Sequence, residues 1–348
     1  MKNELYKLID KLQKQQSLTV SEYQQLIGGY DEALASYTAV KARKVCDKHY
    51  GKDIYIRGLI EISNYCKNDC YYCGIRKSNG NCSRYRLSKD DILDCCKEGY
   101  DLGFRTFVMQ GGEDGHYTDD LLCNIIAEIK SRYPDCAITL SLGERSYESY
   151  KKLRYAGADR YLLRHETADE AHYQRLHPKE LSLQNRMECL KNLKDIGYQV
   201  GCGFMVGSPY QTSENLAKDL KFIEEFSPHM CGIGPFIRHK DTPFRDENNG
   251  SVELTLFLLS IIRLIKPTIL LPATTALGTL SSDGRERGIL AGANVVMPNL
   301  SPLSVREKYM LYEGKISLGQ ESAQCVDELK GRMSEIGYRV VTDRGDAK

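Results

Sequence analysis

The sequence predicts an α/β fold, a closed (β/α)8 barrel of the TIM type that follows an N-terminal helical extension. From residue 54 onward, apolar runs of strand length alternate with amphipathic helical stretches. Strict alternation favours a parallel sheet, and eight such pairs in roughly 250 residues match the size of a closed barrel. Polar clusters follow the expected strands at the end where barrel active sites lie. An open, doubly wound sheet remains the alternative.

The expected strands are short and rich in apolar residues. They cover 54–62, 105–110, 137–142, 160–164, 199–206, 230–237, 269–273 and 294–297. The expected helices between them include 88–102, 119–131, 183–196 and 213–226. Gly157, Gly197 and Gly292 follow expected helices and are predicted to end them, because glycine tolerates the left-handed conformation of a helix C-cap.

The chain is expected to divide into three parts. Residues 1–50 form the helical extension, in which Leu5, Leu8 and Leu12 recur at helical spacing. Residues 51–316 form the barrel. Residues 317–348 are expected to form a helical tail that packs on the barrel.

Composition restricts the partners and the compartment. The 348 residues include 48 lysines and arginines against 47 acidic residues, a formal charge of +1. No polyanion is implied, so nucleic acid is not expected as a partner. No run approaches the ~18 apolar residues of a membrane span, and the N-terminus has no apolar signal core. A cytoplasmic protein with no membrane partner is expected, in which most of the 13 cysteines are reduced.

Three cysteines within eight residues carry the clearest chemical signal. Cys66, Cys70 and Cys73 form a C-x3-C-x2-C pattern directly after the first expected strand. Three thiolates can hold three irons of a 4Fe–4S cluster and leave the fourth iron open to a small chelating molecule. Zinc is the alternative, but it favours four ligands and paired C-x2-C spacings. A disulfide framework does not suit a chain of this length.

Other polar clusters follow the next four expected strands, at 110–114, 141–144, 164–167 and 207–212. Gly111 and Gly112 allow a backbone to approach a ligand closely, and a tight turn is the alternative. Glu166 could accept a hydrogen bond from a ribose or an amine, and Arg186 could clamp a carboxylate. For both, a surface ion pair is the alternative.

Several residues with reactive side chains are expected to be structural. The cysteines at 95, 96, 123 and 189 fall within helices, where free cysteine usually packs in the core. Cys202 and Cys231 lie on expected strands and would fill the barrel interior. His172 and His177 lie in polar stretches and are expected at the surface, whereas His165 is ambiguous.

Longer blocks resemble a known family. The cysteine spacing, with Tyr72 directly before Cys73, resembles the signature of radical S-adenosylmethionine (radical SAM) enzymes. Blocks at 58–64, 72–76, 84–86, 141–144, 157–167, 232–237 and 272–276 resemble the HydE family of [FeFe]-hydrogenase maturases. The resemblance covers about residues 50–316. Biotin synthase and methylornithine synthase share the cluster motif and the barrel, and are the nearest alternatives.

This resemblance implies one 4Fe–4S cluster on Cys66, Cys70 and Cys73, and SAM as the second cofactor. The residues that it places around SAM are Tyr72, Gln110, Gly111, Gly112, Glu113, Ser141, Glu166, Arg186 and Met205. The residues that it places at the substrate end are Arg160, Arg164, Thr274, Thr275, Met297, Tyr309 and Tyr312. Some relatives carry a second cluster on three C-terminal cysteines. Here Ser317, Cys325 and Glu328 stand at those positions, so no second cluster is expected.

The resemblance also implies the reaction and the partners. The enzyme would reductively cleave SAM to a 5′-deoxyadenosyl radical and act on a small organometallic iron–cysteine substrate during assembly of the hydrogenase di-iron subcluster, the H-cluster. Its partners would be the scaffold HydF, the product of HydG, and a reducing ferredoxin or flavodoxin. A biotin synthase-like enzyme acting on an amino-acid-derived substrate and a non-catalytic zinc or redox-sensing barrel are the alternatives.

Strand periodicity adds two expectations about the substrate end. Arg160 and Arg164 are four residues apart on one expected strand, so both should point to the same face. Inward placement would offer two fixed cations to an anionic substrate. Thr274 and Thr275 are consecutive, and only one of them is expected to face the cavity.

Overall fold

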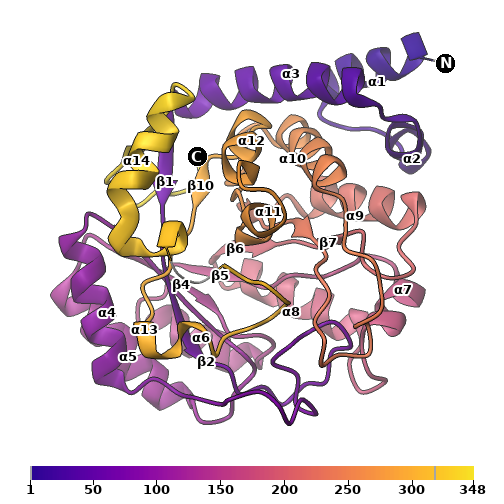
Figure 1. Cartoon of the computed structure of the whole chain (residues 1–348). Coiled ribbons are helices and arrows are strands. Elements are labelled where there is room, and N and C mark those ends of the chain that lie inside the picture. The colour runs from indigo at the N-terminus through magenta and orange to yellow at the C-terminus, as the bar shows by residue number, and fades with distance from the viewer. Residues whose placement is uncertain (1, 317–318) are drawn as a thin grey trace.

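The computed structural model describes residues 2–316 and 319–348, with parallel strands in the centre and helices around them (Figure 1). The strands are β1 Asp53–Ile56, β2 Gly58–Ser63, β3 Thr106–Gly111, β4 Ala137–Ser141, β5 Arg160–Leu162, β6 Gln199–Cys202, β7 Met205–Val206, β8 Met230–Cys231, β9 Gly234–Pro235, β10 Val295–Val296 and β11 Arg339–Val341.

Parallel pairing closes these strands into a barrel. One sheet runs in the order β2-β3-β4-β5-β6-β8. From β8 the pairing continues by bridges from Met230 to Leu270 and from Pro272 to Val295, and β10 then pairs with β1, which leads into β2. The ring therefore closes, which confirms the predicted barrel over an open sheet.

Three of the expected strands are each divided in two. The stretch 54–62 breaks between β1 and β2, the stretch 199–206 between β6 and β7, and the stretch 230–237 between β8 and β9. At the break between β6 and β7, Gly203 has φ 156°, and a Cβ there would lie 2.0 Å from the Gly232 carbonyl oxygen. The two backbones approach so closely that a side chain at residue 203 would not fit.

The helices match the expected amphipathic stretches closely. They are α1 Lys2–Gln15, α2 Val20–Gly29, α3 Glu32–Tyr50, α4 Lys89–Asp101, α5 Asp119–Arg132, α6 Tyr147–Tyr155, α7 Glu170–Leu176, α8 Leu183–Asp195, α9 Ser213–Phe226, α10 Val252–Ile265, α11 Thr275–Leu280, α12 Gly284–Leu290, α13 Leu303–Arg306 and α14 Val326–Glu335, with 3-10 turns at Gly319–Glu321 and Ala323–Cys325. Within the described part of the chain, none of these helices has both the length and the apolar character that crossing a bilayer requires.

Local sequence explains where individual helices begin and end. Ser88 caps α4 by accepting from the Asp91 amide, while the Asp91 side chain accepts from the Ser88 amide, a reciprocal capping box. Gly157, Gly197 and Gly292 have φ of 118°, 91° and 108°, which confirms their predicted place after helices.

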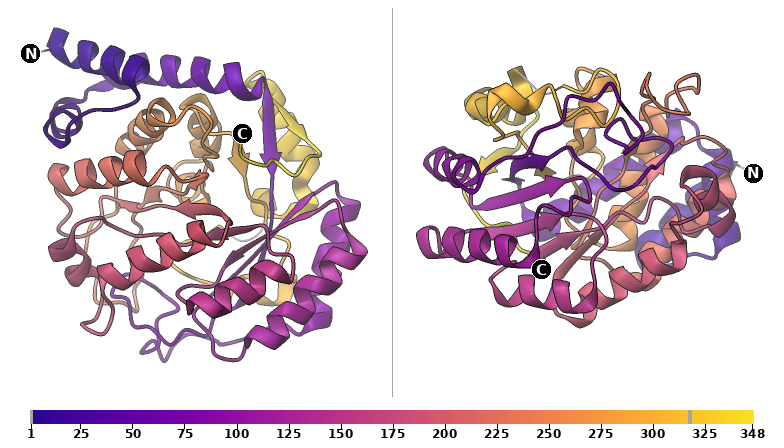
Figure 2. Two further views of the ribbon diagram at one scale, coloured as in Figure 1. Left: turned by 180° about the vertical axis from the view of Figure 1, so that it is seen from behind. Right: turned by 90° about the horizontal axis from the view of Figure 1, so that it is seen from below.

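The N-terminal helices lie outside the ring of strands, as the two views of Figure 2 show. Helix α2 packs on α9, and α3 packs on α10 and α12. The extension thus covers barrel helices with apolar side chains such as Leu26 and Leu34, both buried. The expected boundaries at residues 50 and 316 stay predictions.

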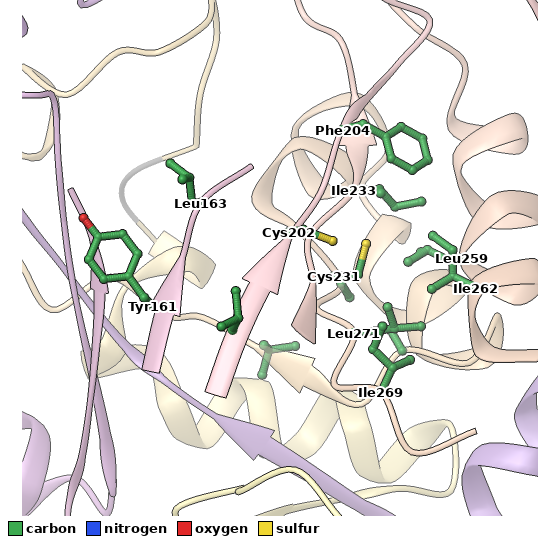
Figure 3. Close-up of a cluster of buried hydrophobic side chains, with 14 of the residues drawn as sticks. Tyr161, Leu163, Cys202, Phe204, Cys231, Ile233, Leu259, Ile262, Ile269 and Leu271 are labelled. Carbon is green, nitrogen blue, oxygen red and sulfur yellow. The ribbon is translucent and has the colours of Figure 1, made fainter. Parts of the chain in front are cut away.

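A second layer of the core lies between the strands and the surrounding helices. Figure 3 shows Cys202 and Cys231 with their sulfur atoms toward Leu259 and Ile262 of α10. Phe204, beyond the end of β6, lies on the same side as Cys202. Both cysteines are buried, as their expected structural role requires, but they face the helical layer and not the barrel interior.

The C-terminal tail contains more than the expected helix. After α14, strand β11 pairs in parallel with β1. The chain then passes under the amino ends of the barrel strands, where the Arg344 carbonyl oxygen accepts a hydrogen bond of 2.8 Å from Thr106. The tail therefore covers the end of the barrel opposite to the polar clusters.

Candidate active site

A cavity of about 340 Å³ opens at the carboxyl ends of the strands. It gathers residues from loops far apart in the sequence. All the predicted site residues except Arg160 line it, namely Cys66, Cys70, Tyr72, Cys73, Gln110, Gly111, Gly112, Glu113, Ser141, Arg164, Glu166, Arg186, Met205, Thr274, Thr275, Met297, Tyr309 and Tyr312. The structure thus brings the cysteine motif and the other polar clusters into one site.

The loop after β2 carries the three cysteines and is held by its own polar side chains. Asp69 accepts from Arg76 through two hydrogen bonds, 2.7 Å from Nε and 2.6 Å from Nη2. These bonds, with others from Ser78, hold the pKa of the Asp69 carboxyl well below its usual range. A bidentate pair of this kind fixes the loop geometrically as well as energetically.

Close backbone contacts clamp the same loop on both sides. The Gly74 amide donates to the Leu311 carbonyl oxygen at 2.8 Å, and a Cβ at Gly74 would lie 2.1 Å from the Met310 oxygen. On the other side, a Cβ at Gly112 would lie 2.2 Å from the Tyr65 oxygen. Glycine is required at both positions because only hydrogen leaves room for the neighbouring chain.

The thiols lie in surroundings that disfavour free thiolates. Burial raises the pKa of Cys66, raises that of Cys70 to about 12, and raises that of Cys73 well above its ordinary value. A bound cationic metal would offset this cost, since metal ligation takes cysteine in the thiolate form.

The number of thiols at the cavity suits an iron–sulfur cluster. Cys66, Cys70 and Cys73 all line it, and a 4Fe–4S cluster takes one thiolate per iron. Three thiols would hold three irons and leave the fourth open to a chelating ligand. Among the described residues, no three acidic, histidine or cysteine side chains converge on a point where a single ion could bind.

A buried ion pair supports another part of the cavity. Arg186 pairs with Glu144 and donates from Nη1 to the Arg164 carbonyl oxygen at 2.7 Å. Only 7% of Arg186 is exposed, so this is a buried pair and not the surface pair that the sequence left open. The pair fixes the backbone at Arg164.

Arg164 and Glu166 present unfilled polar atoms to the cavity. Arg164 Nη2 lies 3.2 Å from Glu166 Oε2, but the orientation is not that of a hydrogen bond. Within the described part of the chain, Arg164 Nε and Nη2 and Glu166 Oε2 are buried and have no hydrogen-bond partner. Buried polar atoms without partners are costly, and a bound polar ligand would satisfy them.

The two consecutive threonines both line the cavity, so the prediction that only one does is wrong. Thr274 is the N-cap residue of α11 and Thr275 its first residue. They lie at the start of a helix, where the period of two that governs a strand does not apply. Thr275 donates to Glu321 at 2.9 Å, whereas Thr274 Oγ1 is buried without a partner among the residues described.

The prediction that Arg160 lines the substrate cavity is wrong. Arg160 is fully buried at the amino end of β5, where its Nη2 lies 2.6 Å from Asp346 of the tail. Its Nη1 also donates to Thr106 at 3.0 Å. A strand rises about 3.3 Å per residue, so the four residues from Arg160 to Arg164 can separate the two by up to roughly 13 Å along the barrel.

Two functional candidates escaped the sequence analysis. Glu61 is fully buried in β2 and accepts from Lys315 Nζ at 2.6 Å and from Asn299 at 2.9 Å. Glu61 and Lys315 both line the cavity. A lone carboxylate within the apolar stretch 58–63 was a usable signal for Glu61, because acidic residues are rarely buried without a partner. No local pattern singles out Lys315.

His172 and His177 are buried, so their expected place at the surface is wrong. His177 stacks on Tyr173 with ring centres 3.9 Å apart. Its Nδ1 lies 3.0 Å from the Tyr173 carbonyl oxygen, which can only accept, so Nδ1 carries the proton. The unprotonated Nε2 then accepts from the Tyr72 hydroxyl at 3.1 Å. His177 thus orients the tyrosine next to Cys73.

Comparison with known proteins identifies related chains. The model of the radical SAM superfamily matches residues 60–223. The [FeFe] hydrogenase maturase subunit HydE of Thermotoga maritima is 42% identical over 92% of this chain and 90% of its own. The 3-methylornithine synthase of Methanosarcina acetivorans is 30% identical over 73% of this chain and 72% of its own.

Solved structures show the same architecture. The crystal structure of methylornithine synthase (PylB) superimposes with a TM-score of 0.84, covering 96% of this chain and 97% of that one, at 26% identity. HydG, a maturase of the [FeFe]-hydrogenase, gives a TM-score of 0.81 over 98% of this chain and 76% of that one. Its identity of 21% supports the shared fold alone.

Proposed function

This chain belongs to the HydE family of radical SAM enzymes, and we propose that its cavity binds one 4Fe–4S cluster and SAM during assembly of the [FeFe]-hydrogenase di-iron subcluster. The observation that carries the proposal is the convergence of three thiols and several unpartnered polar atoms on one cavity, at the carboxyl ends of the strands. Barrel enzymes place their chemistry at that end.

The cysteine wall would hold the cluster. Cys66, Cys70 and Cys73 would each bind one iron, and the loop that Asp69 and Arg76 brace keeps them in place. Held by these thiolates, a reduced cluster would supply one-electron chemistry for the reductive cleavage of SAM. The protein contributes orientation of SAM and exclusion of water.

The polar residues that share the cavity with the cysteines would bind SAM. Glu166 Oε2 has free accepting capacity for a ribose hydroxyl or an ammonium group. Gly111 and Gly112 expose backbone to the cavity, and Gln110 and Arg186 line it beside them. The rest of the proposed SAM contacts are Tyr72, Glu113, Ser141 and Met205.

The substrate would bind at the end of the cavity that Arg164 and Thr274 form, directly beside Glu166, which lies 3.2 Å from Arg164. Arg164 has two N–H groups and Thr274 a hydroxyl without a hydrogen-bond partner, a set that suits a small anionic iron–cysteine complex. Thr275, Met297, Tyr309 and Tyr312 would complete this end. We propose that the complex is the product of HydG, that HydF receives the processed group, that ferredoxin or flavodoxin donates the electron, and that the enzyme works in the cytoplasm.

Arg164→Leu tests the division of the cavity into two ends. Wild-type protein, reconstituted without oxygen and reduced, should cleave SAM and activate hydrogenase in a maturation assay. The variant should keep SAM cleavage and lose activation by at least about tenfold, the effect of one lost charged hydrogen bond. Arg245→Leu is the control, because this arginine is exposed and does not line the cavity.

Two results would contradict the proposal. Full activation by the Arg164→Leu variant, or loss of its SAM binding, would remove the residue from the substrate end. A colourless wild-type protein that holds one zinc and no iron would exclude the radical SAM reaction altogether.

A further inference from the structure

Glu166, the proposed SAM contact, has a strained backbone. Its φ is 66°, in the left-handed region that residues other than glycine seldom adopt. Such a conformation is unfavourable and persists only where the surroundings determine it. The residues that impose it therefore also determine where the carboxylate points.

Backbone hydrogen bonds hold the segment on both sides of Glu166. Arg186 donates to the Arg164 carbonyl oxygen, and the Glu166 amide donates to the Gly203 carbonyl oxygen at 3.0 Å. Two residues further on, the Ala168 amide donates to Asp219 Oδ1 at 2.6 Å. The last of these partners belongs to α9, outside the ring of strands.

A buried histidine makes a second link to the same carboxylate. His165 Nδ1 accepts from the Gly203 amide at 3.3 Å, so the ring proton lies on Nε2. His165 Nε2 then donates to Asp219 Oδ1 at 3.3 Å. Both side chains are fully buried, and burial lowers the pKa of His165 to about 3, so the ring is neutral.

Aromatic packing leaves the imidazole little freedom. The His165 ring centre lies 4.7 Å from that of Phe222 and 5.8 Å from that of Phe204. Neither His165 nor Asp219 lines the cavity, and Asp219 belongs to α9. Since neither side chain touches the cavity, the pair acts on a ligand through the neighbouring segment that carries Glu166.

We infer that His165 and Asp219 are positioning residues that aim the Glu166 carboxylate at SAM. Asp219 anchors the segment at residues 165 and 168, on either side of the strained residue. Helix α9 thereby sets the affinity of the cavity for the hydroxyl or ammonium group that Glu166 binds. The inference rests on the proposed function, since it takes SAM as the ligand of Glu166.

Asp219→Leu and Asp219→Asn separate positioning from simple core packing. The leucine variant loses both hydrogen bonds, and we expect it to raise the Kd of SAM at least about tenfold. The asparagine variant keeps an accepting oxygen for His165 and Ala168, and its Kd should stay within about threefold of wild type. Kd is measured by equilibrium dialysis on the anaerobically reconstituted protein, and the unfolding midpoint on the same samples.

Ser260→Ala is the matched control. Ser260 is a fully buried residue on an outer helix and donates to the Ala291 carbonyl oxygen at 2.9 Å, remote from Glu166. Its loss should lower the unfolding midpoint and leave the Kd of SAM unchanged. His165→Phe keeps the aromatic packing without the hydrogen bonds, and should raise the Kd as Asp219→Leu does, even if the leucine variant does not fold.

A double-mutant cycle with Glu166→Gln completes the test. If Asp219 acts through Glu166, the effects of Asp219→Leu and Glu166→Gln on the Kd should not add. Additive effects, or an unchanged Kd in both Asp219→Leu and His165→Phe, would overturn the inference and leave the proposed function intact. A wild-type protein that holds the cluster and binds no SAM would overturn both.

Discussion

Each cysteine of the cluster motif occupies its own position on the cavity wall. Replacing Cys66, Cys70 or Cys73 by alanine should abolish SAM cleavage and lower the iron content, because each iron that loses its thiolate destabilises the assembly. Cys95→Ala is the control, since Cys95 is buried within α4. Iron content and methionine release measure the outcome. Equal losses in the control would mean that the ligands are wrongly assigned.

His177 should make stability depend on pH. Burial lowers its pKa to about 3 from an ordinary value of 6.5. Below pH 6.5 the His177 imidazole is protonated in the unfolded chain but stays neutral in the folded chain. The contribution of His177 to the free energy of unfolding is therefore complete above pH 6.5 and is lost as pH falls toward 3. For this single proton, the free energy of unfolding should fall by up to about 1.4 kcal/mol per pH unit.

The variant His177→Gln isolates that contribution. Glutamine can still donate to the Tyr173 carbonyl oxygen and accept from Tyr72, but it does not titrate. Urea unfolding between pH 7 and pH 4 should show a shallower loss of stability in the variant than in wild type. If the free energy of unfolding fell equally with pH in the variant and in wild type, the folded protein would not be holding His177 neutral.

At the scale of elements, the loop after β3 limits how the cysteine loop can lie. A Cβ at Gly112 would approach the Tyr65 oxygen to 2.2 Å and the Cys66 Cβ to 2.7 Å. Gly112→Ala should therefore displace the cysteine loop, cost about 1–3 kcal/mol, and reduce cluster content. Gly115→Ala is the control, because its Cβ would meet no described atom within 4 Å. Equal iron content in the two variants would refute the close contact.

At the scale of the whole molecule, the tail stabilises the barrel through one buried cation. Asp346→Ala would leave Arg160, which is fully buried, without its carboxylate partner. Breaking a buried pair costs 3–5 kcal/mol, and because Asp346 is itself part-exposed we expect about 2 kcal/mol in urea unfolding. Asp327→Ala, which breaks an exposed pair with Lys330, should cost less than about 0.5 kcal/mol. Equal losses of unfolding free energy in the two variants would show that the contact between Asp346 and Arg160 does not stabilise the barrel.

The wild-type protein should contain about four irons per chain, the content of one 4Fe–4S centre. Cys325 lies in a 3-10 turn before α14, with Glu328 in the first turn of that helix, and Ser317 lies outside the described residues. Cys325→Ala should leave the iron content unchanged. About six or eight irons per chain in wild type would establish a second cluster.

The sequence by itself determined the order of strands and helices, the closed barrel and the three cysteines. These features depend on local patterns, because side chains repeat with a period of two in strands and 3.6 in helices. The placement of Gln110, Ser141 and Glu166 at one cavity also followed, since the carboxyl ends of parallel strands meet at one end of a barrel.

Only the tertiary structure decided which polar groups satisfy one another. Lys315 meets Glu61 across 254 residues of sequence, and Arg160 meets Asp346 across 186. Buried charges must find partners, but the partner depends on strand register, on height along the barrel and on the path of the tail. None of these leaves a local pattern in the sequence. The sequence therefore predicted where the strands end, whereas the pairing of the buried charged side chains depended on the tertiary structure.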